Sequence, residues 1–202
     1  MAFSDLFNVR KQLTFYGAYH SNPVNVGIHI VCVPILLWTF QVMMTAIPTP
    51  AFLPAIHYTI NDYMTFELNV AAIQAGAYLL YYFLLDPRAA LLYTPQMVLS
   101  VLTSTSFSKQ EGHITTAAII NGISWILQFI GHGAAEKRAP ALLDNIVGAL
   151  VLAPFFVHLE ILFYLGYRPT LHKQLVNDVG VEITRIKKIQ GAQARAAKAK
   201  GN

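Results

Sequence analysis

A stretch of 50 residues, 12–61, contains no Asp, Glu, Lys or Arg. Within it, residues 24–47 are apolar enough, and numerous enough, to cross a hydrocarbon layer about 30 Å thick. Charged residues make up only 12% of the whole chain, about half of the ~25% that is usual in soluble domains. The apolar surplus must face something other than water, which argues against a water-soluble globule and predicts a membrane-embedded chain.

Three further uncharged runs have lengths near the ~20 residues that a spanning helix needs. They are residues 68–85, 89–108 and 112–135. A fifth apolar region, residues 141–165, has Pro154 near its middle and contains Asp144, Asn145, His158 and Glu160. Polar groups at membrane depth are costly, so their presence indicates a function. We predict an all-α fold, a polytopic membrane helical bundle with four spans and a broken or re-entrant fifth apolar region.

Positive charge is concentrated after residue 167. Residues 168–202 hold eight Lys or Arg residues against Asp178 and Glu182. We interpret residues 1–167 as a membrane-embedded catalytic domain and residues 168–202 as a basic cytosolic tail beside anionic membrane lipid. No nucleic-acid partner is expected, because no aromatic residue is interleaved with these charges.

Arg10 and Lys11 place the N-terminus on the cytosolic side as well, which requires an even number of crossings. A fifth region that is broken into a hairpin at Pro154 meets this condition and leaves only Lys109 outside. In the alternative, the third uncharged run does not cross, and the positive residues 137 and 138 lie outside. We therefore expect a multi-pass membrane protein with both termini cytosolic. Residues 198–202, Lys-Ala-Lys-Gly-Asn, also resemble a dilysine retrieval signal of endoplasmic reticulum proteins, although so short a match is weak evidence.

The chain has seven histidines and a single cysteine, so a metal site here must use histidines and carboxylates. On one straight helix His20 and His29 would lie on opposite faces. Between them, however, Asn22 and Pro23 provide a cap residue followed by proline at the first helical position, which predicts a new helix at about residue 23. His20 is then free to fold back over the helix of His29, and Asn25, one turn earlier on the same face, is a candidate for binding substrate.

His132 and Glu136 share one helix face near the end of the fourth span. Counting back along a helix from Tyr167 at the membrane surface places Glu160 about 10 Å deep, close to the ~9 Å depth of His29. We therefore predict one metal ion bound by residues from separate segments, namely His20, His29, His132 and Glu160. Histidine and carboxylate ligands with open positions are the pattern of non-haem Fe(II) oxygenases.

Two alternatives to this metal site follow from the same residues. His158 points away from Glu160 on a helix, so it is the alternative fourth ligand. A single buried histidine is also more often a hydrogen-bonded core residue than a ligand. The metal hypothesis therefore depends on whether the histidines converge.

Three segments of the sequence resemble a known family. They read FYGAYHSNPVNVGIH (residues 15–29, followed by Val33-Pro34), QFIGHGAAEKRAPAL (residues 128–142) and LAPFF (residues 152–156, continuing to Glu160). The chain, from about residue 10 to 170, is similar to the metal-dependent 2-hydroxy fatty acid dioxygenases of fungi. The resemblance implies an enzyme of the endoplasmic reticulum membrane that uses Fe(II) and O₂ to remove one carbon from 2-hydroxy fatty acids, notably in the breakdown of phytosphingosine. The histidine positions of the family fall on His20, His29 and His132, and Glu160 belongs to the pattern.

A 2-hydroxy acid can chelate iron through its carboxylate and hydroxyl groups and leave room for O₂. Lys137 and Arg138, just over a turn beyond His132, are candidates to attract the acid headgroup, although positive residues at a helix end are also ordinary. Glu136 is the candidate catalytic residue, which either orients His132 or pairs with Lys137. The acyl chain is expected to lie between spans, against aromatic residues such as Trp38, Tyr81, Tyr82 and Trp125, although core packing explains these four residues equally well.

Two other classes of function use the same residues. A Zn-dependent intramembrane lipid hydrolase would employ Glu136 or Glu160 as a general base and would not need O₂. A non-enzymatic membrane scaffold would bind no metal and would tolerate replacement of the histidines. Metal analysis and the dependence of activity on O₂ distinguish the three classes.

Overall fold

The computed structural model describes residues 3–136 and 148–200, and most of these residues are helical. In chain order the elements are α1 (Val9–Tyr19), α2 (Pro23–Met44), β1 (His57–Asn61), β2 (Met64–Glu67), α3 (Val70–Leu85), α4 (Pro87–Phe107), α5 (His113–Ile130), α6 (Ala153–Tyr164) and α7 (Pro169–Lys200). A 3-10 turn, Phe3–Phe7, precedes α1, and π-helical turns occupy Gly131–Glu136 and Gly148–Leu152. Lys137, Arg138, Asp144 and Asn145, which the sequence analysis singled out, lie outside the described residues.

The turn between α1 and α2 forms as the sequence predicts. The side chain of Asn22 accepts a hydrogen bond from the backbone N–H of Val24 at 2.9 Å, and Pro23 is the first residue of α2. Asn8 caps α1 in the same way, by accepting from the backbone N–H of Lys11. Because α1 ends at Tyr19, the next residue, His20, turns back toward α2.

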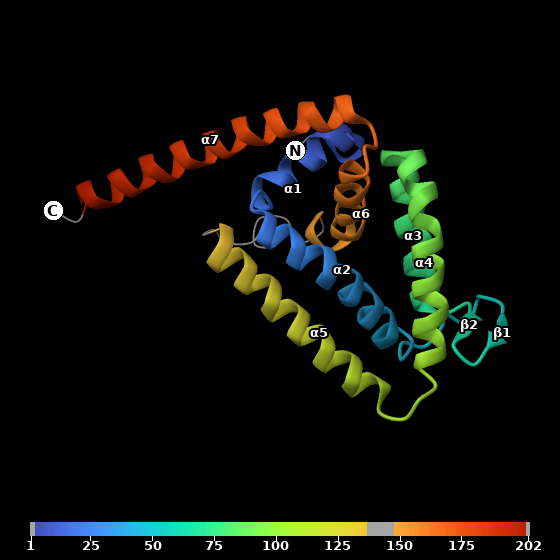
Figure 1. Cartoon of the computed structure of the whole chain (residues 1–202). Helices are drawn as coiled ribbons and strands as arrows, with labels where there is room; N and C mark the ends of the chain where they lie inside the picture. The colour runs from blue at the N-terminus through green and yellow to red at the C-terminus, as the bar shows by residue number, and fades with distance from the viewer. Residues whose placement is uncertain (1–2, 137–147, 201–202) are drawn as a thin grey trace.

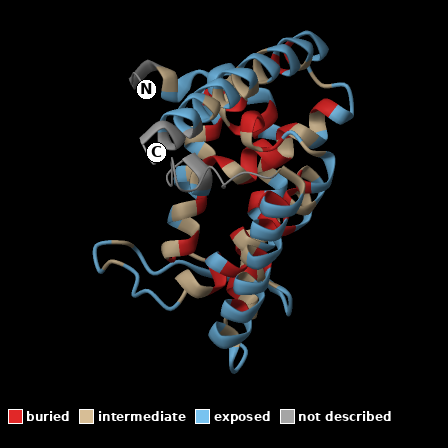
Figure 2. Cartoon of the chain, turned by 90° about the vertical axis from the view of Figure 1, so that its left-hand side faces the viewer, coloured by how far each residue is buried: buried red, intermediate tan, exposed pale blue. Residues whose placement is uncertain are grey.

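The helices form two antiparallel pairs with α6 packed between them. Figure 1 shows α2 lying along α5, and α3 beside α4. Helix α6 packs against α2 and α4, and α7 crosses over α1. The buried aromatic residues Tyr82, Tyr93 and Phe155 join α3, α4 and α6 in one core. Figure 2 shows the buried residues where the helices meet and the exposed residues along their outer faces.

Ion pairs mark the two ends of the molecule. At one end, Arg10 of α1 donates to the carboxylate of Asp178 of α7 at 2.6 and 3.0 Å, which holds the two helices together. At the same end, Asp86, between α3 and α4, accepts from Arg168, just before α7, at 2.5 Å. At the other end, the antiparallel strands β1 and β2 pack against the end of α4, and Lys109 lies 3.7 Å from Glu67. We call these the α7 end and the sheet end.

The structure corrects the predicted architecture at three points. A two-stranded sheet occupies part of a fold that was expected to be all-α. The sharp bend falls between Tyr164 and Pro169, where the helix direction changes by 117°, and the helix from Leu150 to Tyr164 is continuous through Pro154. Four spans are not confirmed. Within the described residues, two helices, Pro23–Met44 and His113–Glu136, are long and apolar enough to cross a membrane, or three if the bent pair counts as one span.

Helices α3 and α4 fall short of the expected spans for different reasons. Helix α3 is apolar but has only 16 residues, fewer than the ~20 that a bilayer crossing needs. Helix α4 has 21 residues, but its proline, serine and threonine residues dilute its apolar character. An uncharged run of about 20 residues therefore does not by itself give a helix that is both long and apolar enough to cross a membrane.

Candidate metal centre and its cavity

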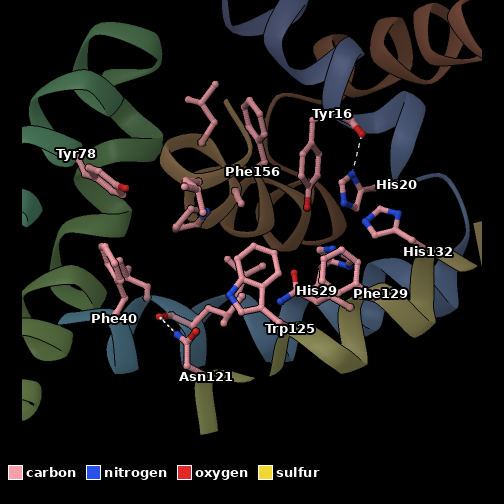
Figure 3. Close-up of a pocket in the computed structure, with 18 of the residues that line it drawn as sticks. Tyr16, His20, His29, Phe40, Tyr78, Asn121, Trp125, Phe129, His132 and Phe156 are labelled. Atoms are coloured by element: carbon pink, nitrogen blue, oxygen red, sulfur yellow. Dashed lines mark hydrogen bonds between the residues drawn. The ribbon is translucent and has the colours of Figure 1, made fainter. Parts of the chain in front are cut away.

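Three histidines from three separate segments converge in the structure. His20 follows α1, His29 lies on α2, and His132 lies in the π-helical turn after α5. Their ring centroids are 4.4 to 4.9 Å apart, and one nitrogen from each ring lies within 4.8 Å of the others. All three side chains are buried, and Figure 3 shows the rings facing one another at one end of a cavity.

The hydrogen bonds of His20 and His29 leave one nitrogen of each ring available. In both residues Nδ1 donates to a backbone carbonyl four residues earlier, at 2.9 Å in each case: His20 to Tyr16 and His29 to Asn25. Because a carbonyl only accepts, Nδ1 carries the proton, and Nε2 keeps its lone pair. Burial lowers the pKa of His20 well below its ordinary value, and His29 lowers it further, so the His20 imidazole is neutral.

His132 completes a donor set that fits a transition metal. Its Nδ1 is buried and has no hydrogen-bond partner within residues 3–136 and 148–200. An unpaired buried nitrogen is costly unless it binds something. Three neutral imidazoles with free lone pairs suit Fe, Zn, Cu or Ni, so this group of residues can hold such an ion.

Close packing of α2 against the end of α5 brings His29 and His132 together. The backbone of Gly131 lies against Asn25: a Cβ atom there would be 2.5 Å from the Asn25 side-chain oxygen and 3.1 Å from Ile28. Only glycine allows this approach without a shift of the neighbouring side chains. His132, the next residue, is thereby carried to the face of α2 that bears His29.

Glu136 fixes the loop that carries His20. Its carboxylate accepts from the backbone N–H groups of Ser21 and Asn22, each at 2.6 Å, and from the Ser21 hydroxyl at 3.0 Å. Glu136 was predicted to orient His132 or to pair with Lys137, and Lys137 lies outside the described residues. The hydrogen bonds of Glu136 connect the turn after α5 to the residues that directly follow His20, and we infer that Glu136 positions the His20 loop.

Replacing Glu136 by Ala is therefore expected to loosen the His20 loop. Two backbone N–H groups lose a charged acceptor, which costs about 2 kcal/mol in the free energy of unfolding. We expect a lower Tm and weaker metal retention, measured by thermal unfolding and by metal analysis after dialysis. Glu136→Gln keeps an acceptor oxygen, so its Tm and metal retention should lie between those of Glu136→Ala and wild type. Glu111 is exposed, and Glu111→Ala is the matched control. Equal metal retention in E136A and wild type would contradict this role.

The remaining predicted site residues lie outside the histidine group. Asn25 is fully buried, and its side chain contacts Gly131 and Glu136 rather than lining the cavity. Glu160 lies on α6 and is not among the residues that approach the three histidines. His158, also on α6, packs edge-on against Tyr93 with ring centroids 5.1 Å apart. The structure thus brings together three of the four predicted ligands.

A cavity of about 400 Å³ extends from the histidines along the seam between α2 and α5. Helix α2 lines it with one face, from His29 to Met43, and Tyr16 and Phe156 cover it from α1 and α6. Figure 3 shows the histidines at one end, Trp125 midway, and Phe40 and Tyr78 at the other end. Among the described residues that line it there is no Lys, Arg, Asp or Glu.

The four aromatic residues named as walls for the acyl chain have different surroundings. Trp125 lines the cavity, but Trp38 donates to a threonine of α4, and the Tyr81 and Tyr82 hydroxyls donate to backbone carbonyls elsewhere. Sequence reasoning missed Tyr16. The signal was available, because a residue four positions before His20 lies on the same helix face.

Comparison with known proteins identifies the family. Residues 6–165, which include all three histidines, match the family described as "2-hydroxy-palmitic acid dioxygenase Mpo1-like". The chain belongs to the Mpo1-like family. It is 34% identical over 183 residues to the 2-hydroxy-palmitic acid dioxygenase MPO1 of Saccharomyces cerevisiae, an alignment that covers 88% of this chain and 92% of the yeast protein. No solved structure matches the chain.

The Mpo1-like region coincides with the part of the chain that builds the site. It begins in the turn before α1, ends just after α6, and leaves α7 outside. The predicted membership of a 2-hydroxy fatty acid dioxygenase family is therefore confirmed.

Proposed function

We propose that this chain is an Fe(II)-dependent dioxygenase that cleaves 2-hydroxy fatty acids by alpha-oxidation to acids one carbon shorter. The observation that carries the proposal is the group of three buried histidines at the head of an apolar cavity. The named activity of the yeast relative supports the same reaction class.

His20, His29 and His132 would hold the iron. When bound, Fe(II) would supply O₂ activation and a Lewis acid for the substrate's carboxylate. In the overall reaction, the bond between C1 and C2 breaks, and one 2-hydroxy acid with one O₂ gives the shorter acid, CO₂ and water. The substrate loses four electrons and O₂ gains four, so no further reductant is required.

The cavity suits an acyl chain. Its described lining is apolar apart from a few hydrogen-bonding side chains and lacks charged Lys and Arg side chains, so the chain's own residues shield the substrate from water while the metal binds its charged end. From His29 to Met43 helix α2 rises by about 21 Å. An extended alkyl chain of 15 bonds, at about 1.2 Å per bond as in an extended backbone, spans about 18 Å. A long-chain acid thus fits along α2, and Lys137 and Arg138 remain candidates to attract its headgroup.

We further propose that the α7 end faces the cytosol, in the endoplasmic reticulum membrane. The positive residues of the α7 end are Arg10, Lys11, Arg88, Arg168 and those of α7, whereas Lys109 lies at the sheet end beside Glu67. An excess of Lys and Arg marks the cytosolic side of membrane proteins. This orientation puts both termini in the cytosol and the histidines near the cytosolic face.

Metal analysis combined with O₂ uptake tests the proposal. Purified protein is expected to contain stoichiometric iron, to consume O₂ when 2-hydroxypalmitate is added, and to release the 15-carbon acid. Bound zinc with activity that persists without O₂ would indicate the hydrolase instead. Protein without metal would indicate a scaffold.

A further inference from the structure

Tyr16 places a phenol hydroxyl beside the three histidines. The residue lies on α1, and its ring stacks on that of His20, with centroids 3.9 Å apart and planes inclined by 13°. Phe156 of α6 packs against the ring of Tyr16, with centroids 4.8 Å apart. These contacts fix the ring, and Figure 3 shows its hydroxyl pointing into the cavity.

The Tyr16 hydroxyl makes no hydrogen bond that holds the fold together. Within residues 3–136 and 148–200 it has no hydrogen-bond partner. The dashed line in Figure 3 marks a different bond, in which the Tyr16 backbone carbonyl accepts from His20. Other tyrosines in the core behave differently, since Tyr82 donates to the carbonyl of Val151 and Tyr167 to the carboxylate of Asp86. A buried tyrosine hydroxyl normally finds a partner, so this one is free to bind a ligand in the cavity.

The amide groups in the cavity wall are already engaged in the fold. Gln128, one turn before His132, donates one side-chain N–H to the carbonyl of Ser124 at 3.3 Å, which ties its amide group to its own helix. Asn121 donates to Thr39 at 2.8 Å, and Gln12 donates to the carbonyl of Asp5. Near the histidines, Tyr16 offers a hydroxyl that makes no hydrogen bond within the described residues and can both donate and accept.

We propose that the Tyr16 hydroxyl binds the 2-hydroxyl group of the substrate and thereby selects one enantiomer. The proposal rests on the proposed function. C2 of the substrate carries a carboxylate, a hydroxyl, an alkyl chain and a hydrogen atom. With the carboxylate at the histidine end and the chain along α2, one enantiomer presents its hydroxyl to Tyr16 and the other presents hydrogen. Three fixed points of contact distinguish mirror images, and one hydrogen bond in a buried site changes affinity by about 10- to 100-fold.

Binding measurements without O₂ test this proposal, because turnover cannot occur. Iron-loaded wild type and Tyr16→Phe, purified in detergent, are titrated with each enantiomer of 2-hydroxypalmitate and with palmitate. Wild type is expected to bind one enantiomer 10- to 100-fold more tightly than the other. Tyr16→Phe keeps the ring stacked on His20, so iron content and palmitate affinity should be unchanged while the enantiomer preference disappears. Tyr81→Phe, which removes a hydroxyl outside the cavity, is the matched control and should keep the preference.

The possible outcomes separate this proposal from the proposed function. A preference that persists in Tyr16→Phe, or one that Gln128→Leu abolishes in its place, would overturn the role of Tyr16 while leaving the dioxygenase intact. Wild type that neither binds nor turns over either enantiomer would overturn both. Loss of palmitate binding or of iron in Tyr16→Phe would show that the residue supports the cavity or the histidines and would also overturn the proposal.

Discussion

Replacing His29 by Ala is expected to remove bound iron and to lower O₂ uptake with 2-hydroxypalmitate by at least about 1,000-fold. Loss of a residue that merely orients a metal ligand lowers metal affinity or activity by about 10- to 100-fold, and loss of the ligand itself should lower them further. His29 is the best choice among the three, because α2 holds it from both sides and its Nδ1 is fixed by Asn25. Iron content by elemental analysis and O₂ uptake are the measurements.

His158→Ala is the matched control for His29→Ala. It removes an imidazole that lies largely inside the protein but packs against Tyr93, away from the histidine group. This variant should retain its iron and its activity. Iron lost from His158→Ala but kept by His29→Ala would contradict the metal centre described above.

Glu160 requires its own variant, since the sequence predicted it as a ligand and the structure leaves it outside the group. Glu160→Gln preserves the size of the side chain and removes the charge. If three histidines suffice, this variant keeps stoichiometric iron. Iron loss equal to that of His29→Ala would show that the carboxylate moves to the metal on binding.

Replacing Leu36 by Trp is expected to restrict the protein to acids with shorter alkyl chains. Leu36 lines the cavity seven residues beyond His29, about 10 Å along the helix. A tryptophan there blocks the part of the cavity toward Phe40 and Met43. If the block keeps just three methylene groups of a long acid out of the cavity, the free energy of binding falls by about 2.4 kcal/mol. This loss lowers kcat/KM for 2-hydroxypalmitate roughly 50-fold. 2-Hydroxyoctanoate, which ends before the block, should be turned over as in wild type.

Ile35→Trp is the matched control for Leu36→Trp. Ile35 is adjacent in sequence, but 36% of its surface is exposed and it does not line the cavity. This variant should leave the chain-length preference unchanged. If L36W lowers kcat/KM for both acids equally, or for neither, the acyl chain does not lie along α2.

Several local features could be predicted from the sequence because neighbouring residues alone determine them. Asn22 and Pro23 begin a helix by capping and by a fixed backbone angle, whatever surrounds them. The two helices that are long and apolar enough to cross a membrane, α2 and the one that starts at His113, coincide with two of the predicted spans. The three histidines stood out because ionisable groups in apolar segments require a partner.

The convergence of the histidines was predicted from depth, and depth is only one coordinate. Glu160 has nearly the same predicted depth as His29, yet it lies on α6 outside the group. Two residues at one level of a bundle can face different neighbours, and the rotation of each helix about its axis is set by side-chain packing. The position of Glu136 follows from the same cause, since its partners, Ser21 and Asn22, lie more than 100 residues away in sequence.

The sequence by itself determined where α2 begins, which family the chain resembles and which histidines stand in apolar segments, because these depend on composition and on contacts within a few residues. The tertiary structure alone decided that three histidines form the group without Glu160, that Glu136 binds the His20 loop, and that Tyr16 faces the cavity. These features depend on distances between segments far apart in the chain, and such distances are fixed only when the helices pack against one another.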